Sequence, residues 1–170
     1  MHRIDSTKPI SIDHGAPDAA KRIELSAEFR VPAERLFKII AWHEAWPEWF
    51  PLLRSIEVDH SASASPSATG VGTRRLCRLR LIGELDERIV AWDPPRTYRY
   101  SVNSPRSPFA RHTAELRVVP MDADRATLIW TAWFEHRRWM GVPVAAWCSR
   151  AALAVLMRAA LRRLRALHNL

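Results

Sequence analysis

The last long segment of the chain, residues 143–167, constrains the fold more than any other stretch. At 3.6 residues per turn it is long enough for about seven helical turns. Pro143 suits the first helical position, no later proline or glycine interrupts the segment, and the strong helix formers Ala, Leu, Met and Arg dominate it. One face collects small and apolar residues, namely Ala145, Ser149, Ala152, Leu156, Ala159, Ala160 and Leu167. A long amphipathic helix of this kind needs an apolar surface to lie on.

Strand-like segments before the helix can supply that surface. Apolar and polar residues alternate in 21–31, 74–82, 84–92, 97–103, 111–119 and 127–136, and more briefly around Ile56 and Val58. Alternation is typical of strands with one buried face, and the short turns between them favour an antiparallel meander. On 84–92 the predicted inner residues are Leu85, Ile89 and Ala91, and on 74–82 they are Cys77, Leu79 and Leu81.

The segment after the first predicted strand is helical and aromatic. Val31-Pro32 opens a helix whose buried face is Leu36, Phe37 and Ile40. Prolines then break the sequence AWHEAWPEWFP into short helical turns that carry four large aromatic side chains. These side chains either fill the core, as large aromatics commonly do, or line a ligand pocket.

Together these elements predict an α+β fold in which a curved antiparallel sheet wraps around the long C-terminal helix, with two short helices after the first strand. Residues 1–20 are polar and aperiodic and are predicted to form a flexible tail, and residues 21–170 form one domain. Because the helix offers small side chains to the sheet, an apolar cavity should remain between them.

Composition limits the classes of function. The net charge is +8, with 23 Arg and 3 Lys, which suits an anionic membrane surface, an acidic carrier protein or nucleic acid. Biased arginine usage on a solvated surface explains it equally well. No nucleic-acid-reading module accompanies the charge, so nucleic acid is the least favoured partner. The two cysteines form no metal or redox motif, and no signal peptide is recognisable, so a cytoplasmic location is expected.

Several segments together resemble the START-like, or SRPBCC, superfamily with its helix-grip fold, and within it the polyketide cyclase/dehydrase and lipid-transport branch. The resemblance lies in residues 31–37, 44–50, 70–74, 87–96 and 107–110 and in the closing helix. It implies a deep hydrophobic cavity for a lipid, sterol, quinone or polyketide. Some members cyclise or dehydrate a poly-β-ketone held by an acyl carrier protein, and others only bind or carry. Catalytic members use an inward Arg with nearby Ser and Trp on the strand that corresponds to 84–92. Arg88 is the arginine there, but alternation gives it the polar face, and the stretch 84–88 contains neither the Ser nor the Trp.

The inner faces of the predicted strands carry few polar residues, and two of them could do chemistry. Registers inferred from the turns place Glu87, Val102, His112 and Phe134 in one row across the sheet. Glu87 and His112 would then lie about 10 Å apart at ~4.8 Å per strand. A histidine beside a carboxylate could act as a general base, or each could be satisfied structurally. The other inward polar residues are Arg75, Tyr98, Tyr100 and His136.

The predicted function is binding of a hydrophobic small molecule, without a metal or other cofactor, in a cavity between sheet and helix. The alternative is a cyclase, aromatase or dehydratase that acts on a carrier-bound poly-β-ketone, with Glu87 and His112 as catalytic residues. The predicted ligand contacts are Trp42, Trp46, Trp49, Leu79, Tyr98, Tyr100, Trp130, Phe134, Ala152 and Leu156.

Overall fold

The computed structural model describes residues 21–65, 68–81, 83–104, 107–137 and 143–168, with the side chains of the last helix from residue 148 onward. The predicted tail, residues 1–20, and the side chain of Ala145 therefore lie outside the described residues. The elements are β1 (Lys21–Phe29), α1 (Ala33–Ala41), the 3-10 helix η1 (His43–Ala45), α2 (Trp46–Trp49), β2 (Leu53–Asp59), β3 (Arg74–Leu79), β4 (Gly83–Asp93), β5 (Thr97–Asn103), β6 (Phe109–Pro120), β7 (Ala126–His136) and α3 (Pro143–His168).

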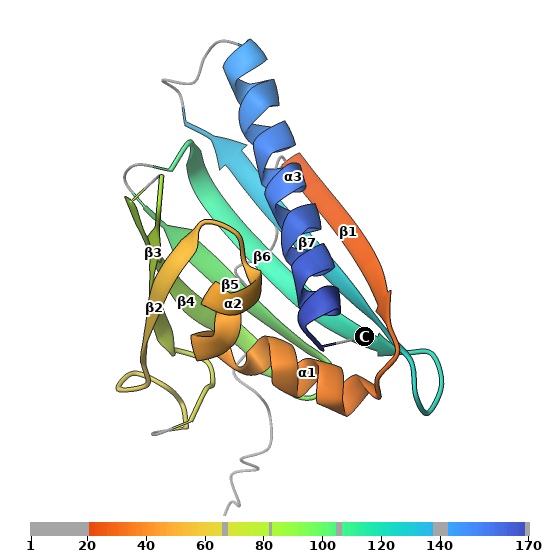
Figure 1. Cartoon of the computed structure of the whole chain (residues 1–170). Helices are drawn as coiled ribbons and strands as arrows, with labels where there is room; N and C mark the ends of the chain where they lie inside the picture. Colours follow the sequence, from red (N-terminus) through yellow and green to blue (C-terminus); the bar gives the residue numbers. More distant parts are fainter. Residues whose placement is uncertain (1–20, 66–67, 82, 105–106, 138–142, 169–170) are drawn as a thin grey trace, which may run out of the picture.

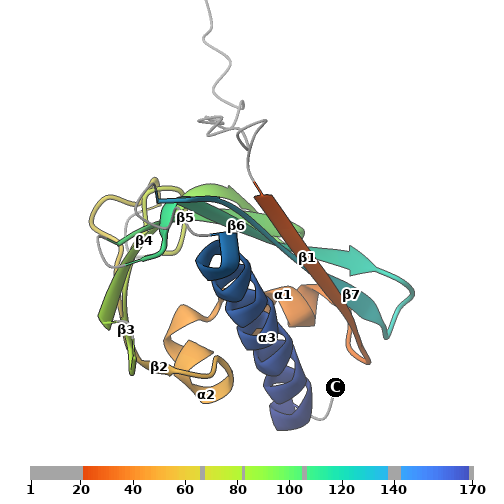
Figure 2. The same cartoon turned by 90° about the horizontal axis from the view of Figure 1, so that it is seen from above.

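The seven strands form one antiparallel sheet in the order β1-β7-β6-β5-β4-β3-β2. Strands β2 to β7 are a meander, and β1 joins its free edge beside β7. The sheet curves around α3, and α1 and α2 lie on the same concave side (Figures 1 and 2). The predicted helix-grip architecture is thus confirmed.

The buried face of α3 differs from the predicted one. Met157, Ala160, Leu161 and Leu164 are buried against the sheet, whereas Leu167 of the predicted face is 52% exposed. The larger apolar side chains contact the core because they bury more area per residue. Ala160 belongs to both the predicted and the observed buried face, whereas Ser149, Ala152, Leu156 and Ala159 of the predicted face border a cavity.

A β-bulge in β4 explains a second difference. Ile89 pairs with Tyr100, but Ala91 pairs with Arg99, so Val90 is an extra residue in β4. An extra residue moves the following side chains to the opposite face of the sheet. The prediction that Ala91 faces inward was therefore wrong. Its neighbour Trp92 turns inward instead and contacts Phe37 and Tyr98.

The outer face of the sheet is less basic than its arginines suggested, because acidic residues pair with several of them. Ion pairs on this face include those of Arg74 with Asp86, of Arg78 with Glu57 and Glu84, and of Arg99 with Glu115.

The prediction that Leu81 is an inner residue of its strand was wrong. Strand β3 ends at Leu79, so Leu81 lies beyond it and is 77% exposed.

Candidate functional site: an apolar cavity beneath the last helix

A cavity of about 540 Å³ lies between α3 and the concave face of the sheet. Its walls come from β3 to β7, from α3, and from the segment 50–53 that leads from α2 into β2. Two of its lining residues on α3, Ala152 and Val155, are also exposed to solvent. The mouth of the cavity therefore lies along this part of α3.

Most of the predicted site residues line this cavity. The small face of α3 borders it because alanine and serine side chains leave a gap that the sheet does not fill. The predicted residues in the lining are Trp46, Leu79, Glu87, Tyr100, His112, Trp130, Ala152 and Leu156. Their roles as ligand contacts or catalytic groups stay predictions.

Four predicted ligand contacts do not line the cavity. Trp42 is 60% exposed and borders a separate shallow groove beside α1. Trp49 is buried behind Trp46, and Phe134 is buried beneath neighbouring rings. Tyr98 is buried deeper, where its hydroxyl donates to the Ile40 carbonyl 3.0 Å away. Alternation correctly gave the inner face for Tyr98 and Phe134, but it does not distinguish a filled core from a cavity.

Sequence reasoning missed the residues at the two ends of the cavity. The segment 50–53 leads into β2 and residues 107–109 lead into β6, and irregular segments of this kind carry no periodic signal. The available indications were the predicted aromatic cluster, which includes Phe50, and the resemblance of residues 107–110 to the family. The other lining residues not predicted as ligand contacts are Pro51, Leu52, Leu53, Cys77, Leu85, Ser107, Pro108, Phe109, Ala132, Ser149, Leu153, Val155, Met157 and Ala159.

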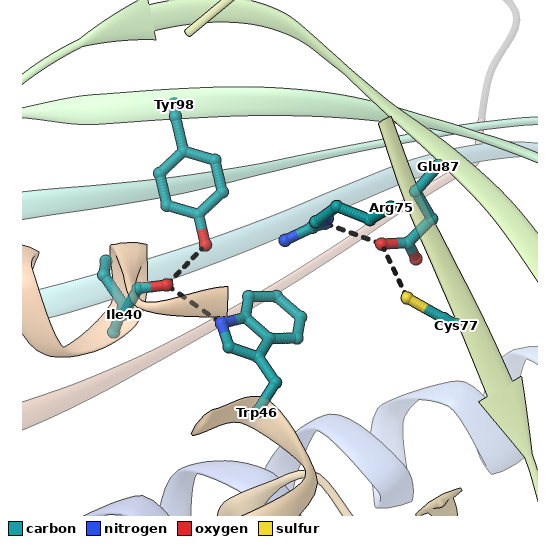
Figure 3. Close-up of polar contacts among 6 residues, drawn as sticks. All are labelled: Ile40, Trp46, Arg75, Cys77, Glu87 and Tyr98. Carbon is teal, nitrogen blue, oxygen red and sulfur yellow. Dashed lines mark hydrogen bonds and ion pairs between the residues drawn. The ribbon is translucent and has the colours of Figure 1, made fainter. Parts of the chain in front are cut away.

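One backbone carbonyl accepts hydrogen bonds from two aromatic side chains, Trp46 and Tyr98, at the aromatic end of the site. The Ile40 carbonyl at the end of α1 accepts hydrogen bonds from Trp46 Nε1 at 2.9 Å and from the Tyr98 hydroxyl (Figure 3). Trp46 also stacks obliquely on Trp49, with 4.7 Å between ring centroids. Helices α1 and α2 are thus joined to β5 by hydrogen bonds and ring contacts.

A buried ion pair lies beside the cavity. Arg75 Nη2 donates to Glu87 Oε2 at 2.6 Å, and the two side chains are 0% and 8% exposed (Figure 3). The guanidinium lies 4.5 Å from the Trp46 ring centroid and 4.4 Å from that of Tyr100, which is cation–π geometry. Cys77 Sγ lies 3.5 Å from the same carboxylate oxygen.

Charges in this pair depend on each other. Burial disfavours the charged guanidinium, but the charge of Glu87, together with smaller effects from Tyr98, Cys77 and Tyr100, outweighs it and raises the pKa of Arg75. Burial raises the pKa of Glu87 as well, and Arg75 opposes that shift by favouring the carboxylate. Alternation gave Arg75 and Glu87 an inward face each, but it did not show that they form an ion pair, which depends on their direct pairing across β3 and β4.

The predicted row across the sheet is present. Glu87 pairs with Val102, Val102 with His112, and His112 with Phe134. Both Glu87 and His112 line the cavity, but the hydrogen bonds of Glu87 in the described structure go to Arg75 and Cys77. Burial alone lowers the pKa of His112 to about 4, so its imidazole is neutral at physiological pH.

A second histidine is buried away from the cavity. His43 in η1 is fully buried among Trp46, Trp92 and Tyr98, and neither ring nitrogen has a hydrogen-bond partner in the described structure. Burial, with smaller effects from Arg75 and His60, holds the pKa of His43 well below its usual range.

These two histidines predict how stability depends on pH. Both are neutral in the folded state, while the unfolded chain takes up protons below pH of about 6.5. The free energy of unfolding should therefore be greatest above that pH and should fall below it. Each histidine contributes a slope of about 1.4 kcal/mol per pH unit, which for His112 continues to about pH 4. Denaturant titrations from pH 7.5 to 4.5 measure this slope.

Replacing either histidine with phenylalanine should remove the contribution of that histidine to the pH dependence of the free energy of unfolding. The two variants are His112→Phe and His43→Phe. If stability does not change between pH 7.5 and 5, the histidines are not buried in the neutral form.

Among the described residues, no cluster of His, Cys, Asp and Glu is arranged to hold a metal ion. His136 Nε2 and Ser149 Oγ are 3.0 Å apart, which joins the end of β7 to α3 at the cavity wall.

In the described part of the chain, no helix has the length and apolar character to cross a membrane.

A curved antiparallel sheet closed by a long C-terminal helix over an apolar cavity defines a START-like, helix-grip protein. The chain belongs to the polyketide cyclase/dehydrase and lipid transport family, whose model matches residues 20–169.

Solved structures share this fold. A protein from Thermobifida fusca is 26% identical, with a TM-score of 0.64 over 86% of this chain and 94% of that one. The Zhui aromatase/cyclase from Streptomyces sp. R1128 is 19% identical, with a TM-score of 0.63 over 86% and 94% of the two chains. A START superfamily protein from Mycobacterium smegmatis is 15% identical, with a TM-score of 0.65 over 86% and 98%. The last two likenesses show the fold alone.

A curated relative from Mycobacterium tuberculosis, described as an uncharacterized protein, is 28% identical over 71 residues. Those residues are 41% of this chain and 38% of the relative, so the match spans well under half of either protein.

Proposed function

We propose that the protein binds an apolar small molecule in the cavity between the sheet and α3. The observation that carries this proposal is the cavity itself, whose walls are mostly apolar and whose volume of about 540 Å³ falls within the range of about 300–1,000 Å³ for ligand pockets. At about 30 Å³ per water molecule it has the room of roughly 18 waters. An apolar ligand of similar size gains free energy by displacing that water.

Tryptophan fluorescence tests this proposal directly. Trp46 and Trp130 line the cavity, so an apolar ligand should change their emission and raise the melting temperature through preferential binding to the folded state. A panel of fatty alcohols, fatty acids, sterols, quinones and aromatic polyketides supplies the ligands. If the whole panel leaves emission and melting temperature unchanged, the binding proposal is wrong.

We further propose that the mouth of the cavity docks on an anionic membrane surface, from which an apolar ligand could enter. Val155 at the mouth is 62% exposed, and exposed apolar residues beside cations suit a membrane interface. The arginines of α3 have no carboxylate partner among the described residues, unlike Arg74, Arg78 and Arg99 on the outer sheet face. Three of them reach backbone carbonyls instead, namely Arg150, Arg163 and Arg165.

Vesicle binding should therefore depend on lipid charge and on salt. Phosphatidylserine-containing vesicles should bind the protein at low salt and lose it steeply at physiological salt, where screening acts within ~8 Å. Arg158→Glu with Arg162→Glu should abolish binding, and Arg74→Glu on the outer sheet face is the matched control. Binding to an acidic carrier protein but not to vesicles would instead favour a protein partner.

Glu87 and His112 favour a second candidate function, a cyclase or dehydratase that acts on a carrier-bound poly-β-ketone. Both residues line the cavity, and a neutral imidazole can abstract a proton in an enolisation. On this alternative, His112→Ala and Glu87→Gln should each abolish turnover while the protein still binds an apolar probe. Full turnover in both folded variants would remove these residues from the mechanism.

A further inference from the structure

The polar atoms that face the cavity are few, and some already have partners. Ser149 Oγ lies within hydrogen-bond distance of His136. Ser107 Oγ accepts the backbone N–H of Phe109 at 3.2 Å. Burial raises the pKa of Tyr100 well above its usual range, so it stays a neutral phenol, and Trp130 Nε1 has no hydrogen-bond partner among the described residues.

Glu87 presents the negative end of its ion pair to the cavity. Glu87 is in the cavity lining, whereas Arg75 is not, because its guanidinium lies against the rings of Trp46 and Tyr100. The contacts of the carboxylate with Arg75 and Cys77 both use Oε2. The oxygen Oε1 therefore has acceptor capacity that no described residue uses.

His112 offers a second, uncharged hydrogen-bonding group. Its ring lines the cavity, and no side chain or backbone group in the described residues forms a hydrogen bond with it. A neutral imidazole has one donor and one acceptor nitrogen, so it can serve either side of a hydroxyl group. The described lining contains no Arg or Lys, so no cation faces the cavity.

We infer that the cavity selects an uncharged apolar molecule that carries a hydroxyl group, and that it discriminates against carboxylates. The hydroxyl would donate to Glu87 Oε1 or form a hydrogen bond with His112. A ligand carboxylate would lose its hydration without meeting a cation, and it would face the Glu87 carboxylate as well. This inference rests on the proposed function, because it concerns the ligand of the same cavity.

Two ligands with the same chain test the inference on the wild-type protein. Dodecan-1-ol and dodecanoate are titrated at pH 8, where the acid is ionised, below the concentrations at which either aggregates. We expect the alcohol to bind at least tenfold tighter. Equal or tighter binding of dodecanoate would overturn the inference and leave the binding proposal intact. If neither ligand binds, and the wider ligand panel also has no effect, both proposals fail.

A charge change separates the effect of the protein from the lower water solubility of the alcohol. Glu87→Gln keeps the shape of the side chain and leaves Arg75 without its counter-ion. Dodecanoate then no longer faces a like charge, and the uncompensated charge of Arg75 behind position 87 attracts it, so its affinity should rise at least tenfold and it should raise the melting temperature of the variant more than that of the wild type. Asp86→Asn removes the neighbouring exposed carboxylate, which pairs with Arg74, and it should leave the preference unchanged.

A second variant keeps the test valid if Glu87→Gln does not fold. His112→Leu removes the neutral hydrogen-bonding group and adds no charge. It should weaken dodecanol binding about fivefold to tenfold and leave dodecanoate binding nearly unchanged. If His112→Leu weakens both ligands equally, the imidazole acts only through cavity shape, and the hydroxyl assignment is overturned.

Discussion

Replacing Arg75 with methionine is expected to lower the free energy of unfolding by about 3–5 kcal/mol, the usual cost of removing one partner from a buried ion pair. Methionine fills part of the space between Trp46 and Tyr100 but leaves the Glu87 carboxylate buried without a counter-ion. Urea denaturation at pH 8 measures the loss. The loss should shrink as the pH falls, because Glu87 in the variant takes up a proton more readily when folded than when unfolded.

The adjacent residue provides the control. Arg74 is on the same strand and pairs with Asp86, next to Glu87, but that pair is exposed. Arg74→Met should cost only about 0–1 kcal/mol, as is usual for surface pairs. The double variant Arg75→Met with Glu87→Leu should regain much of the loss, since neither side chain then needs a counter-ion. Equal losses at positions 74 and 75 would show that burial of the pair does not determine its contribution.

Replacing Ala152 with tryptophan is expected to give the largest change in ligand binding, a loss of at least a hundredfold. Ala152 lines the cavity and is also exposed at its mouth. An indole group there can fold over the opening without displacing core residues, so overpacking, which typically costs about 1–3 kcal/mol, should be avoided. We expect an unchanged or higher melting temperature together with the loss of dodecanol binding, measured by fluorescence titration and differential scanning calorimetry.

Ala166→Trp is the matched control for this substitution. Ala166 is exposed on the same helix and is not part of the cavity lining, so binding should be unchanged. A large drop in the melting temperature of Ala152→Trp would mean that α3 is close-packed at this position. Unchanged binding with unchanged stability would mean that ligands do not enter past α3.

Periodicity in the sequence predicted most of the fold, because each strand has one wet and one buried face. Residues 97–103 were predicted as a strand with the same bounds as β5, and the row from Glu87 to His112 followed from short turns that fix the register. The bulge at Val90 could not be predicted, since one extra residue leaves the local pattern almost unchanged. The face of Trp92 was missed for the same reason.

The candidate site was only partly predictable, because a cavity depends on what several distant segments fail to fill. The small residues of α3 indicated a gap, and Ala152 and Leu156 do border it. Composition alone did not distinguish Trp46, which lines the cavity, from the exposed Trp42 four residues earlier. That difference arises from the tight turn through η1, which places successive tryptophans on different sides of the chain.

The two sides of the cavity should differ in stiffness. At the Ile40 carbonyl, hydrogen bonds from Trp46 and Tyr98 hold α1, α2 and β5 in one unit. The α3 side is bordered by small side chains of the helix and by segment 50–53, in which Leu52 has a left-handed backbone with a φ of 70°. That conformation is costly for a leucine. Ligands of different length should therefore be accommodated by movement of this segment, while the aromatic end keeps its shape and sets how deep the first carbons of any ligand can go.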